Sequence, residues 1–213
     1  MRRHIVCLGD SNTYGYSPEV PLGRFDETER WTCLLQQGLG EGYLVLEEGL
    51  PGRTTVFEDP VEEGMSALPY LYPCLMSHAP VDLLVLMLGT NDTKERMGAN
   101  PYVIGRGLAR LARKAQTIDC WAAGWPNLLL ITPLAIDKGA EHAPLTQGMG
   151  AGCVEKSLGL SAQFRAVAEE LGCHYLDANT LGLKQNPVDF MHLTRESHRI
   201  LAEALTGLIP TLI

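Results

Sequence analysis

Short apolar runs separated by longer amphipathic stretches recur along the whole chain. We predict β-strands at Ile5–Leu8, Leu44–Glu47, Leu83–Leu88, Leu128–Thr132 and His174–Leu176. The segment Val81–Leu88 is nearly all apolar, as expected for a central strand that is covered on both faces. Strands that alternate with helices are typical of a parallel sheet with crossover helices.

The stretches between the strands carry apolar residues at helical spacing. One face repeats at steps of four and three, at Ile104, Leu108, Leu111, Ala115 and Ile118. A second face comprises Leu160, Phe164, Val167, Ala168 and Leu171. A last helix from about Glu196 to Leu208 is predicted to bury Ile200, Leu201, Ala204 and Leu208. The pattern indicates an α/β fold, a three-layer α/β/α sandwich of flavodoxin type with five parallel strands in the order 2-1-3-4-5.

Two segments stand outside this alternation. Pro18–Arg30 and Ala135–Gly159 are rich in Gly, Pro and charge, which predicts long surface loops or lids. We find no internal repeat and no linker, and a chain of 213 residues fits one domain over residues 1–213.

The net charge and the cysteines indicate which kinds of binding partner and which cellular compartment to expect. The net charge is −8 with scattered Lys and Arg, which argues against nucleic acid or an anionic membrane surface as partner and favours an uncharged or modest-sized small-molecule substrate. The apolar run after Met1–His4 is too short for a secretory signal. Six cysteines without a C-x-x-C pair indicate small buried thiols in a reducing cytoplasm, as for Cys7 and Cys173. We expect no metal site, since there is no His-Glu-x-x-His and there are no paired cysteines.

A serine follows the first predicted strand directly. Gly9 and Asp10 form the expected turn, and Ser11 would stand at the carboxyl edge of the sheet, where open α/β folds bind ligands. The alternative is that Asp10 and Ser11 only cap the next helix, because both are preferred N-cap residues.

A nucleophilic serine needs a base and a group that orients the base. Of the six histidines, His192 lies in a short loop before the last helix and has Asp189 three residues earlier. His198 is expected to point outward from the last helix, and His174 begins a strand. The alternative for the Asp189-x-x-His192 pair is a chance spacing in a surface loop.

Two loops offer donors for a negative oxygen. Asn91 follows the third strand and has an amide NH2, unless it only closes an Asx-turn; Gly52 follows the second strand and has an unobstructed backbone N–H, unless it only forms a turn. The next residue, Arg53, either orients this loop or is an exposed surface charge.

Residues close to Ser11 in the chain are candidates for the substrate pocket. Substrate-binding candidates are Asp10, Tyr14 and Tyr16. Phe25 and Trp31 either line the same pocket or belong to the core or to a subunit interface.

These blocks, in this order, resemble those of the SGNH hydrolases, the GDSL-type esterases. The matching residues are Gly9-Asp10-Ser11, Gly52, Gly89-x-Asn91-Asp92 and Asp189-x-x-His192. A closer likeness is to the bacterial arylesterase and acyltransferase branch, in Gly9-Asp10-Ser11-x-Thr13, Glu48-Gly49-Leu50-x-x-Arg53-Thr54-Thr55 and Met87–Lys94. Asn12 departs from the family pattern, which has Leu there, and the last third matches only through the Asp-His block.

The resemblance implies a cofactor-free serine esterase that cleaves short acyl esters through an acyl-serine intermediate, with water or an alcohol as acceptor. Ser11 would be the nucleophile, His192 the base and Asp189 its orienting group, with Ser11, Gly52 and Asn91 forming the oxyanion hole. The resemblance also implies a homo-oligomer. Alternatives are a carbohydrate O-acetyl esterase with the same triad and a non-catalytic ligand-binding module. A nucleotide-binding flavodoxin-like protein is disfavoured because the first turn lacks Gly-x-Gly-x-x-Gly.

Overall fold

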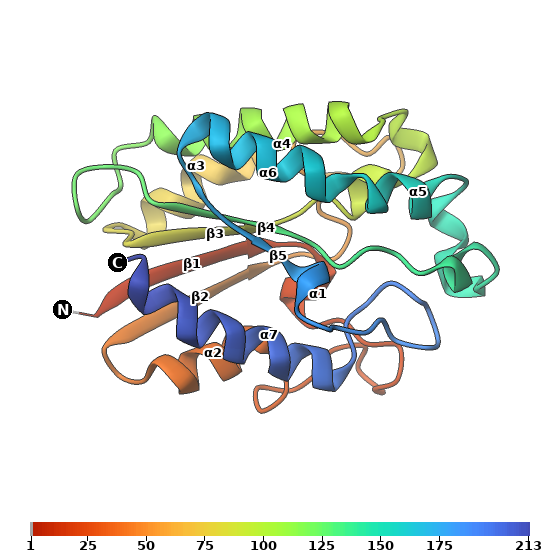
Figure 1. Ribbon diagram of the computed structural model, residues 1–213, viewed down its shortest axis with the longest axis horizontal. Coiled ribbons are helices and arrows are strands. Elements are labelled where there is room, and N and C mark those ends of the chain that lie inside the picture. The colour runs from red at the N-terminus through yellow and green to blue at the C-terminus, as the bar shows by residue number, and fades with distance from the viewer. Residues whose placement is uncertain (1) are drawn as a thin grey trace.

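A five-stranded parallel sheet between two layers of helices forms the centre of the molecule (Figure 1). The computed structural model describes residues 2–213. The strands are β1 (Arg3–Gly9), β2 (Tyr43–Gly49), β3 (Leu83–Met87), β4 (Leu128–Thr132) and β5 (His174–Asp177). Their order is β2-β1-β3-β4-β5 and every neighbouring pair is parallel, so the predicted fold and strand order are confirmed.

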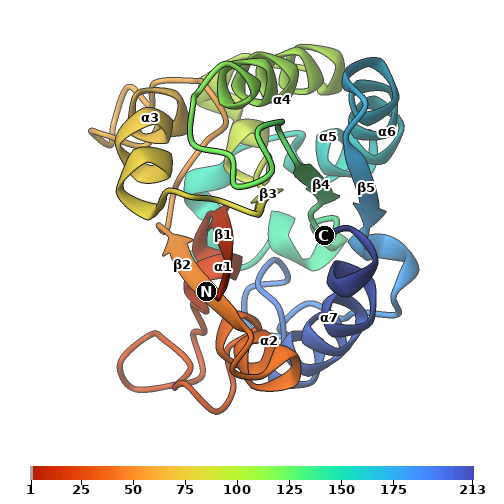
Figure 2. The same ribbon diagram turned by 90° about the vertical axis from the view of Figure 1, so that its left-hand side faces the viewer.

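The sheet is covered on both faces, as Figure 2 shows. One layer consists of α3 (Ala67–His78), α4 (Pro101–Gln116) and α6 (Leu160–Leu171), and the other of α2 (Trp31–Leu39) and α7 (Arg195–Leu208). In β1, Val6 and Leu8 pack into the first layer, whereas Ile5 and Cys7 pack into the second. Because both faces are buried, the strand sequence is continuously apolar instead of alternating.

Helix α4 follows its sequence signals closely. Its N-cap Asn100 accepts a hydrogen bond from the backbone N–H of Val103 at 2.9 Å, and Pro101 occupies the first turn, where no N–H partner is needed. Its predicted apolar face is buried against the sheet and α6. Arg113 and Lys114 lie in the last turn, where cations interact favourably with the helix dipole.

The buried face of helix α7 matches the prediction in part: Leu201 is buried as predicted, whereas Ile200, Ala204 and Leu208 are only partly buried. Its buried face comprises Ser197, His198, Leu201, Ala202 and Leu205. The expectation that His198 points outward is therefore wrong, since its side chain is fully buried. One ring nitrogen has a partner there, because Nδ1 accepts a hydrogen bond from the backbone N–H of Trp31 at 3.2 Å, whereas Nε2 has none in the described chain. Burial lowers the pKa of His198 to about 3, so the ring stays neutral.

The segment 135–159, predicted as a loop, contains three short helices: Lys138–Glu141, Pro144–Met149 and α5 (Cys153–Leu158). A small apolar cluster explains this, because Ile136, Met149, Val154 and Met191 pack together away from the main core. The segment Pro18–Arg30 has neither helix nor strand among the described residues, as predicted.

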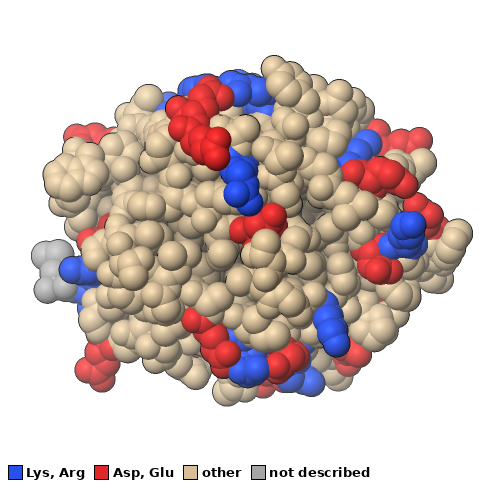
Figure 3. Space-filling model, in the orientation of Figure 1, with Lys and Arg blue, Asp and Glu red and all other residues tan. Residues whose placement is uncertain are grey.

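The surface and the thiols agree with the composition. On the face in Figure 3, Lys and Arg side chains are interspersed with Asp and Glu side chains. All six cysteines are free, and Cys7 is buried, whereas Cys173 is half-buried. Within residues 2–213, no helix combines the length and the apolar character that crossing a membrane requires.

The first three strands end in register at one edge of the sheet. Gly9 lies beside both Gly49 and Met87, so the loops that follow β1, β2 and β3 leave from the same place. Helix α1 (Ser11–Tyr14) sits directly on this edge (Figure 1). Gly49 has to be glycine there, because a Cβ atom would lie 2.2 Å from the backbone nitrogen of Tyr14.

Candidate active site

Ser11 is the first residue of α1 and lies at the carboxyl end of β1. Asp10 caps this helix and accepts a hydrogen bond from the backbone N–H of Asn12 at 3.0 Å. Asp10 is therefore the N-cap of α1, whereas the Ser11 hydroxyl does not cap the helix and points to His192. Asp10 is buried behind the serine, and this burial raises the pKa of its carboxyl to about 6.

Ser11, His192 and Asp189 form a continuous chain of hydrogen bonds. The Oγ of Ser11 lies 2.8 Å from Nε2 of His192, and Nδ1 of His192 lies 2.7 Å from Oδ2 of Asp189. The other carboxylate oxygen of Asp189 accepts the backbone N–H groups of Met191 and His192, each at 3.0 Å. A serine that can pass its proton to an oriented imidazole is an activated nucleophile.

The turn that carries Asp189 and His192 is held by its own backbone. Phe190 has φ 60°, a left-handed conformation that aromatic residues rarely adopt. Its N–H donates to the carbonyl of Asn186 at 2.7 Å, and the N–H of Asn186 donates to the carbonyl of His192 at 2.6 Å. Burial raises the pKa of Asp189, but the hydrogen bond and charge of His192 outweigh it and hold the pKa below its usual value. Asp189 is therefore ionised at neutral pH.

Asn91 and Gly52 lie in the wall of the same pocket as Ser11. The Nδ2 of Asn91 donates one hydrogen bond to the carbonyl of Arg53 at 3.1 Å, which orients the amide and leaves its second N–H for a ligand. Gly52 has φ 87°, and a Cβ there would lie 2.9 Å from atoms of Glu62 and Met65. Within residues 2–213, no hydrogen bond uses the backbone N–H of Ser11 or of Gly52.

Two buried side chains fasten the Gly52 loop to its neighbours. The alternative that Arg53 is an exposed surface charge is wrong, because its side chain is 5% exposed and donates to the carbonyls of Gly9, at 3.0 Å, and of Glu48. Asp92 accepts the backbone N–H of Thr55 at 3.0 Å and its hydroxyl. Burial raises the pKa of Asp92 to about 6, and the Thr55 hydrogen bonds oppose this. Together these contacts tie the loop that follows Gly52 to the end of β1 and to the segment that follows β3.

The pocket has a volume of about 520 Å³ and is mixed in character. The ring of Tyr16 lies 4.5 Å from the ring of His192 and forms part of the wall. Further apolar lining comes from Pro51, Val61, Leu145, Met149 and Met191, and charged lining from Glu62, Lys94 and Arg96.

The remaining substrate-binding candidates lie elsewhere. The ring of Tyr14 faces away, with the Arg24 guanidinium 4.1 Å above it. Phe25 and Trp31 are fully buried, and Asp10 is 1% exposed, so within the described chain none of these residues lines the pocket.

Asn12, which appeared in the sequence only as a departure from the family pattern, links the two halves of the site. Its Oδ1 accepts the backbone N–H of Leu193 at 2.9 Å, and its carbonyl accepts the indole N–H of Trp31 at 3.1 Å. The residue next to the serine thus holds the residue next to the histidine. No signal in a single sequence reveals this contact, because it spans 181 positions.

One group of metal-ligand side chains is close together in the described chain, formed by Glu48, Cys74 and His78. It lies outside the pocket, and two of its members already contact each other, since Nε2 of His78 lies 2.6 Å from Oε1 of Glu48. The Tyr70 hydroxyl donates to the other oxygen of Glu48 at 2.6 Å. This geometry is that of a hydrogen-bonded network at the end of β2.

Comparison with known proteins gives consistent results. Residues 7–200 match the GDSL-like lipase/acylhydrolase family. The structure is similar to that of the Mycobacterium smegmatis aryl esterase, with 33% identity, a TM-score of 0.90 and coverage of 99% of this chain and 100% of that chain. It is also similar to Est24, a carbohydrate acetylesterase from Sinorhizobium meliloti, with 31% identity, a TM-score of 0.90 and full coverage of both chains, 100% each. No functionally curated protein matches the chain in sequence.

Proposed function

We propose that this chain, which belongs to the GDSL-like lipase/acylhydrolase family and is a carboxylic ester hydrolase, cleaves short, acetyl-like esters. The proposed reaction passes through an acyl-serine intermediate. The observation that carries the proposal is the chain of hydrogen bonds from Ser11 through His192 to Asp189 at the floor of a pocket of about 520 Å³.

In the proposed mechanism, the Oγ of Ser11 attacks the ester carbonyl carbon while Nε2 of His192 takes the hydroxyl proton. The carboxylate of Asp189 holds the Nδ1–H tautomer and stabilises the imidazolium that forms. His192 then gives the proton to the leaving alcohol. Water, activated by the same imidazole, attacks the acyl-serine and releases the acid.

The negative oxygen of each tetrahedral intermediate needs hydrogen-bond donors already in place. We assign this task to the backbone N–H groups of Ser11 and Gly52 and to the amide of Asn91. Their proximity in the pocket wall and the free N–H of the Asn91 amide support the assignment. Tyr16, packed against His192, is proposed to limit the length of the acyl group.

An alcohol in place of water would give acyl transfer. The apolar wall formed by Val61, Leu145, Met149 and Met191 supports binding of such an acceptor. A second candidate is deacetylation of carbohydrates by the same residues, which the similarity to a carbohydrate acetylesterase favours.

Turnover of aryl acetate, butyrate and octanoate by the wild type and the Ser11→Ala variant tests the proposal. We expect the acetate to be cleaved fastest and Ser11→Ala to lose turnover of all three. Equal rates in both proteins would overturn it. Added alcohol separates hydrolysis from transfer, and acetylated xylose measures the second candidate.

A further inference from the structure

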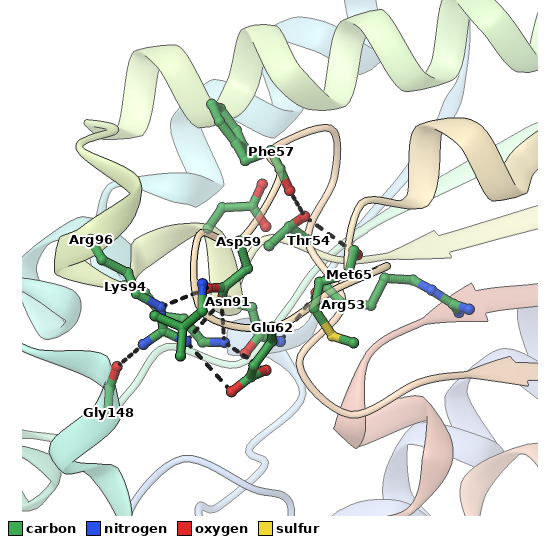
Figure 4. A network of polar contacts seen from close by, with 12 residues as sticks. Arg53, Thr54, Phe57, Asp59, Glu62, Met65, Asn91, Lys94, Arg96 and Gly148 are labelled. Atoms are coloured by element: carbon green, nitrogen blue, oxygen red, sulfur yellow. Dashed lines mark hydrogen bonds and ion pairs between the residues drawn. The ribbon is translucent and has the colours of Figure 1, made fainter.

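Four charged side chains, those of Asp59, Glu62, Lys94 and Arg96, form a cluster (Figure 4). Asp59 and Glu62 come from the loop after Gly52, and Lys94 and Arg96 from the segment after Asn91. Glu62, Lys94 and Arg96 line the same pocket as Ser11 and His192. The mechanism above uses none of them.

Asp59 is held firmly in this cluster. It is buried and accepts two hydrogen bonds from Arg96, at 2.8 and 2.7 Å, one from Lys94 at 3.1 Å and one from the backbone N–H of Val61 at 2.9 Å. The Arg96 hydrogen bonds, with those from Val61 and Lys94, hold the pKa of Asp59 well below its usual value. Asp59 therefore neutralises one of the two cations permanently.

Glu62 is held loosely. Its carboxylate lies 3.7 Å from Nζ of Lys94 and 3.6 Å from Nη2 of Arg96, which is too long for hydrogen bonds. Its side chain is 47% exposed, whereas that of Lys94 is 7% exposed. Glu62 is thus a counter-ion of Lys94 and Arg96 whose carboxylate can move into solvent without breaking a hydrogen bond to either cation.

Lys94 has donors to spare. An ammonium group has three N–H donors, and within residues 2–213 the Lys94 ammonium uses one of them, toward Asp59. A nearly buried cation with free donors in a pocket wall is a recognition element for an anionic or oxygen-rich group. Arg96 is fixed by Asp59 and by the carbonyl of Gly148 at 2.6 Å, and its Nη2 lies 3.6 Å from Oε1 of Glu62, whereas Lys94 lies near Oε2.

We propose that Lys94 and Arg96 form an anion subsite that Glu62 occupies in the free protein and that a carboxylate of the substrate takes over. The preferred substrates would then be short esters that carry a carboxylate on the alcohol or the acyl part. This inference rests on the proposed function, and it adds the chemical class of the substrate. The exchange replaces one carboxylate by another, so the charge of the pocket is unchanged while the new carboxylate gains hydrogen bonds that Glu62 does not make.

Binding to Ser11→Ala protein tests the subsite without turnover. The probes are 4-acetoxybenzoate, with the carboxylate on the alcohol part, and monophenyl succinate, with the carboxylate on the acyl part. Each is compared with its neutral methyl ester as a ratio of Kd values. The ratio is measured in the Ser11→Ala background alone and with Glu62→Gln, Lys94→Met or Glu63→Gln added. Glu63 is the matched control, because it is the next acid of the same exposed loop and, in the described chain, is not part of the pocket wall.

We expect Glu62→Gln to shift the ratio about tenfold toward the carboxylate for at least one probe, the effect of one charge in a half-exposed site. Lys94→Met should abolish the preference, and Glu63→Gln should change it by less than about twofold. The probe that responds identifies the part of the ester that faces the subsite. A ratio that moves no further in Glu62→Gln than in Glu63→Gln, for both probes, overturns the proposal.

Hydrolysis of phenyl acetate, which has no carboxylate, distinguishes failure of the anion subsite from failure of the esterase proposal. Turnover that depends on Ser11, without any effect of Glu62 on the Kd ratio, would refute the subsite and leave the esterase proposal intact. A carboxylate preference controlled by Glu62 without turnover of any ester would refute the esterase proposal and leave the subsite intact.

Discussion

Replacing Asn12 by Ala is the perturbation that best probes how the site is assembled. The side-chain oxygen of Asn12 is the acceptor for the backbone N–H of Leu193, which follows the candidate base directly. Both residues are 2% exposed, and in the described chain no other side chain accepts this N–H. The variant removes the acceptor and leaves a buried donor without a partner.

The size of the effect follows from this geometry. Leaving a buried N–H unsatisfied costs about 1–3 kcal/mol, and the deleted atoms leave a small void in addition. For a chain of this length, about 2 kcal/mol corresponds to a drop of about 4–8 °C in Tm. A displacement of the imidazole from Ser11 lowers kcat/KM much more than the lost stability suggests, because an error of about 1 Å costs on the order of 100-fold.

The assay pairs thermal melting with kcat/KM for phenyl acetate at a temperature where both proteins are folded. Gln36→Ala is the control, since Oε1 of Gln36 also accepts a backbone N–H, that of Val45 at 2.8 Å, near the amino end of β2, and neither residue lines the pocket. We expect both variants to melt earlier and only Asn12→Ala to lose about 10- to 100-fold in kcat/KM. An Asn12→Ala protein with lowered Tm and kcat/KM within twofold of wild type would refute the reasoning.

Three further outcomes follow from the same structure. Asn91→Ala should keep its fold by circular dichroism and lose about 10²–10³ in kcat, as expected for one oxyanion donor; normal turnover would remove Asn91 from the mechanism. Asp189→Asn should lose about 10⁴ in kcat because the amide favours the wrong imidazole tautomer, and a loss below tenfold would contradict its orienting role. His198 has a folded pKa of about 3 against 6.5 for the free side chain, so its contribution to stability is complete above pH 6.5 and is lost progressively as the pH falls toward 3. The loss is about 2 kcal/mol at pH 5, so His198→Gln should melt with less dependence on pH between 7.5 and 5, and an unchanged dependence would refute this interpretation.

The fold could be predicted because its sheet is buried on both sides. Continuous apolar runs such as Leu83–Met87 have few alternatives to a central parallel strand, and the helix face from Ile104 to Ala115 keeps its period without interruption. The last helix was misjudged because its inward residues include His198, a polar side chain that becomes acceptable only when the Trp31 backbone supplies a partner. That partner is 167 positions away in the chain.

The candidate site also contains residues that could be predicted from the sequence and residues that could not. Ser11, Gly52 and Asn91 each lie within four residues of the end of a strand, so the common edge of a parallel sheet brings them together. Asp189 is only three residues from His192, within reach of its imidazole. Tyr14 and Tyr16 are two residues apart, yet α1 ends between them at Gly15 and sends their rings to different places. Lys94, Arg96 and Glu62 were missed as pocket residues because a charge run is usually a solvated surface. The single-domain organisation, the cytoplasmic location and the homo-oligomer stay predictions.

Labelling with a fluorophosphonate probe, followed by peptide mass spectrometry, shows whether Ser11 is activated, because only a serine with a neighbouring base reacts quickly. We expect one adduct, on Ser11, that forms rapidly in the wild type and disappears in a folded His192→Ala variant. An unlabelled wild type, an adduct on another residue, or equal labelling of Ser11 in His192→Ala would contradict this expectation.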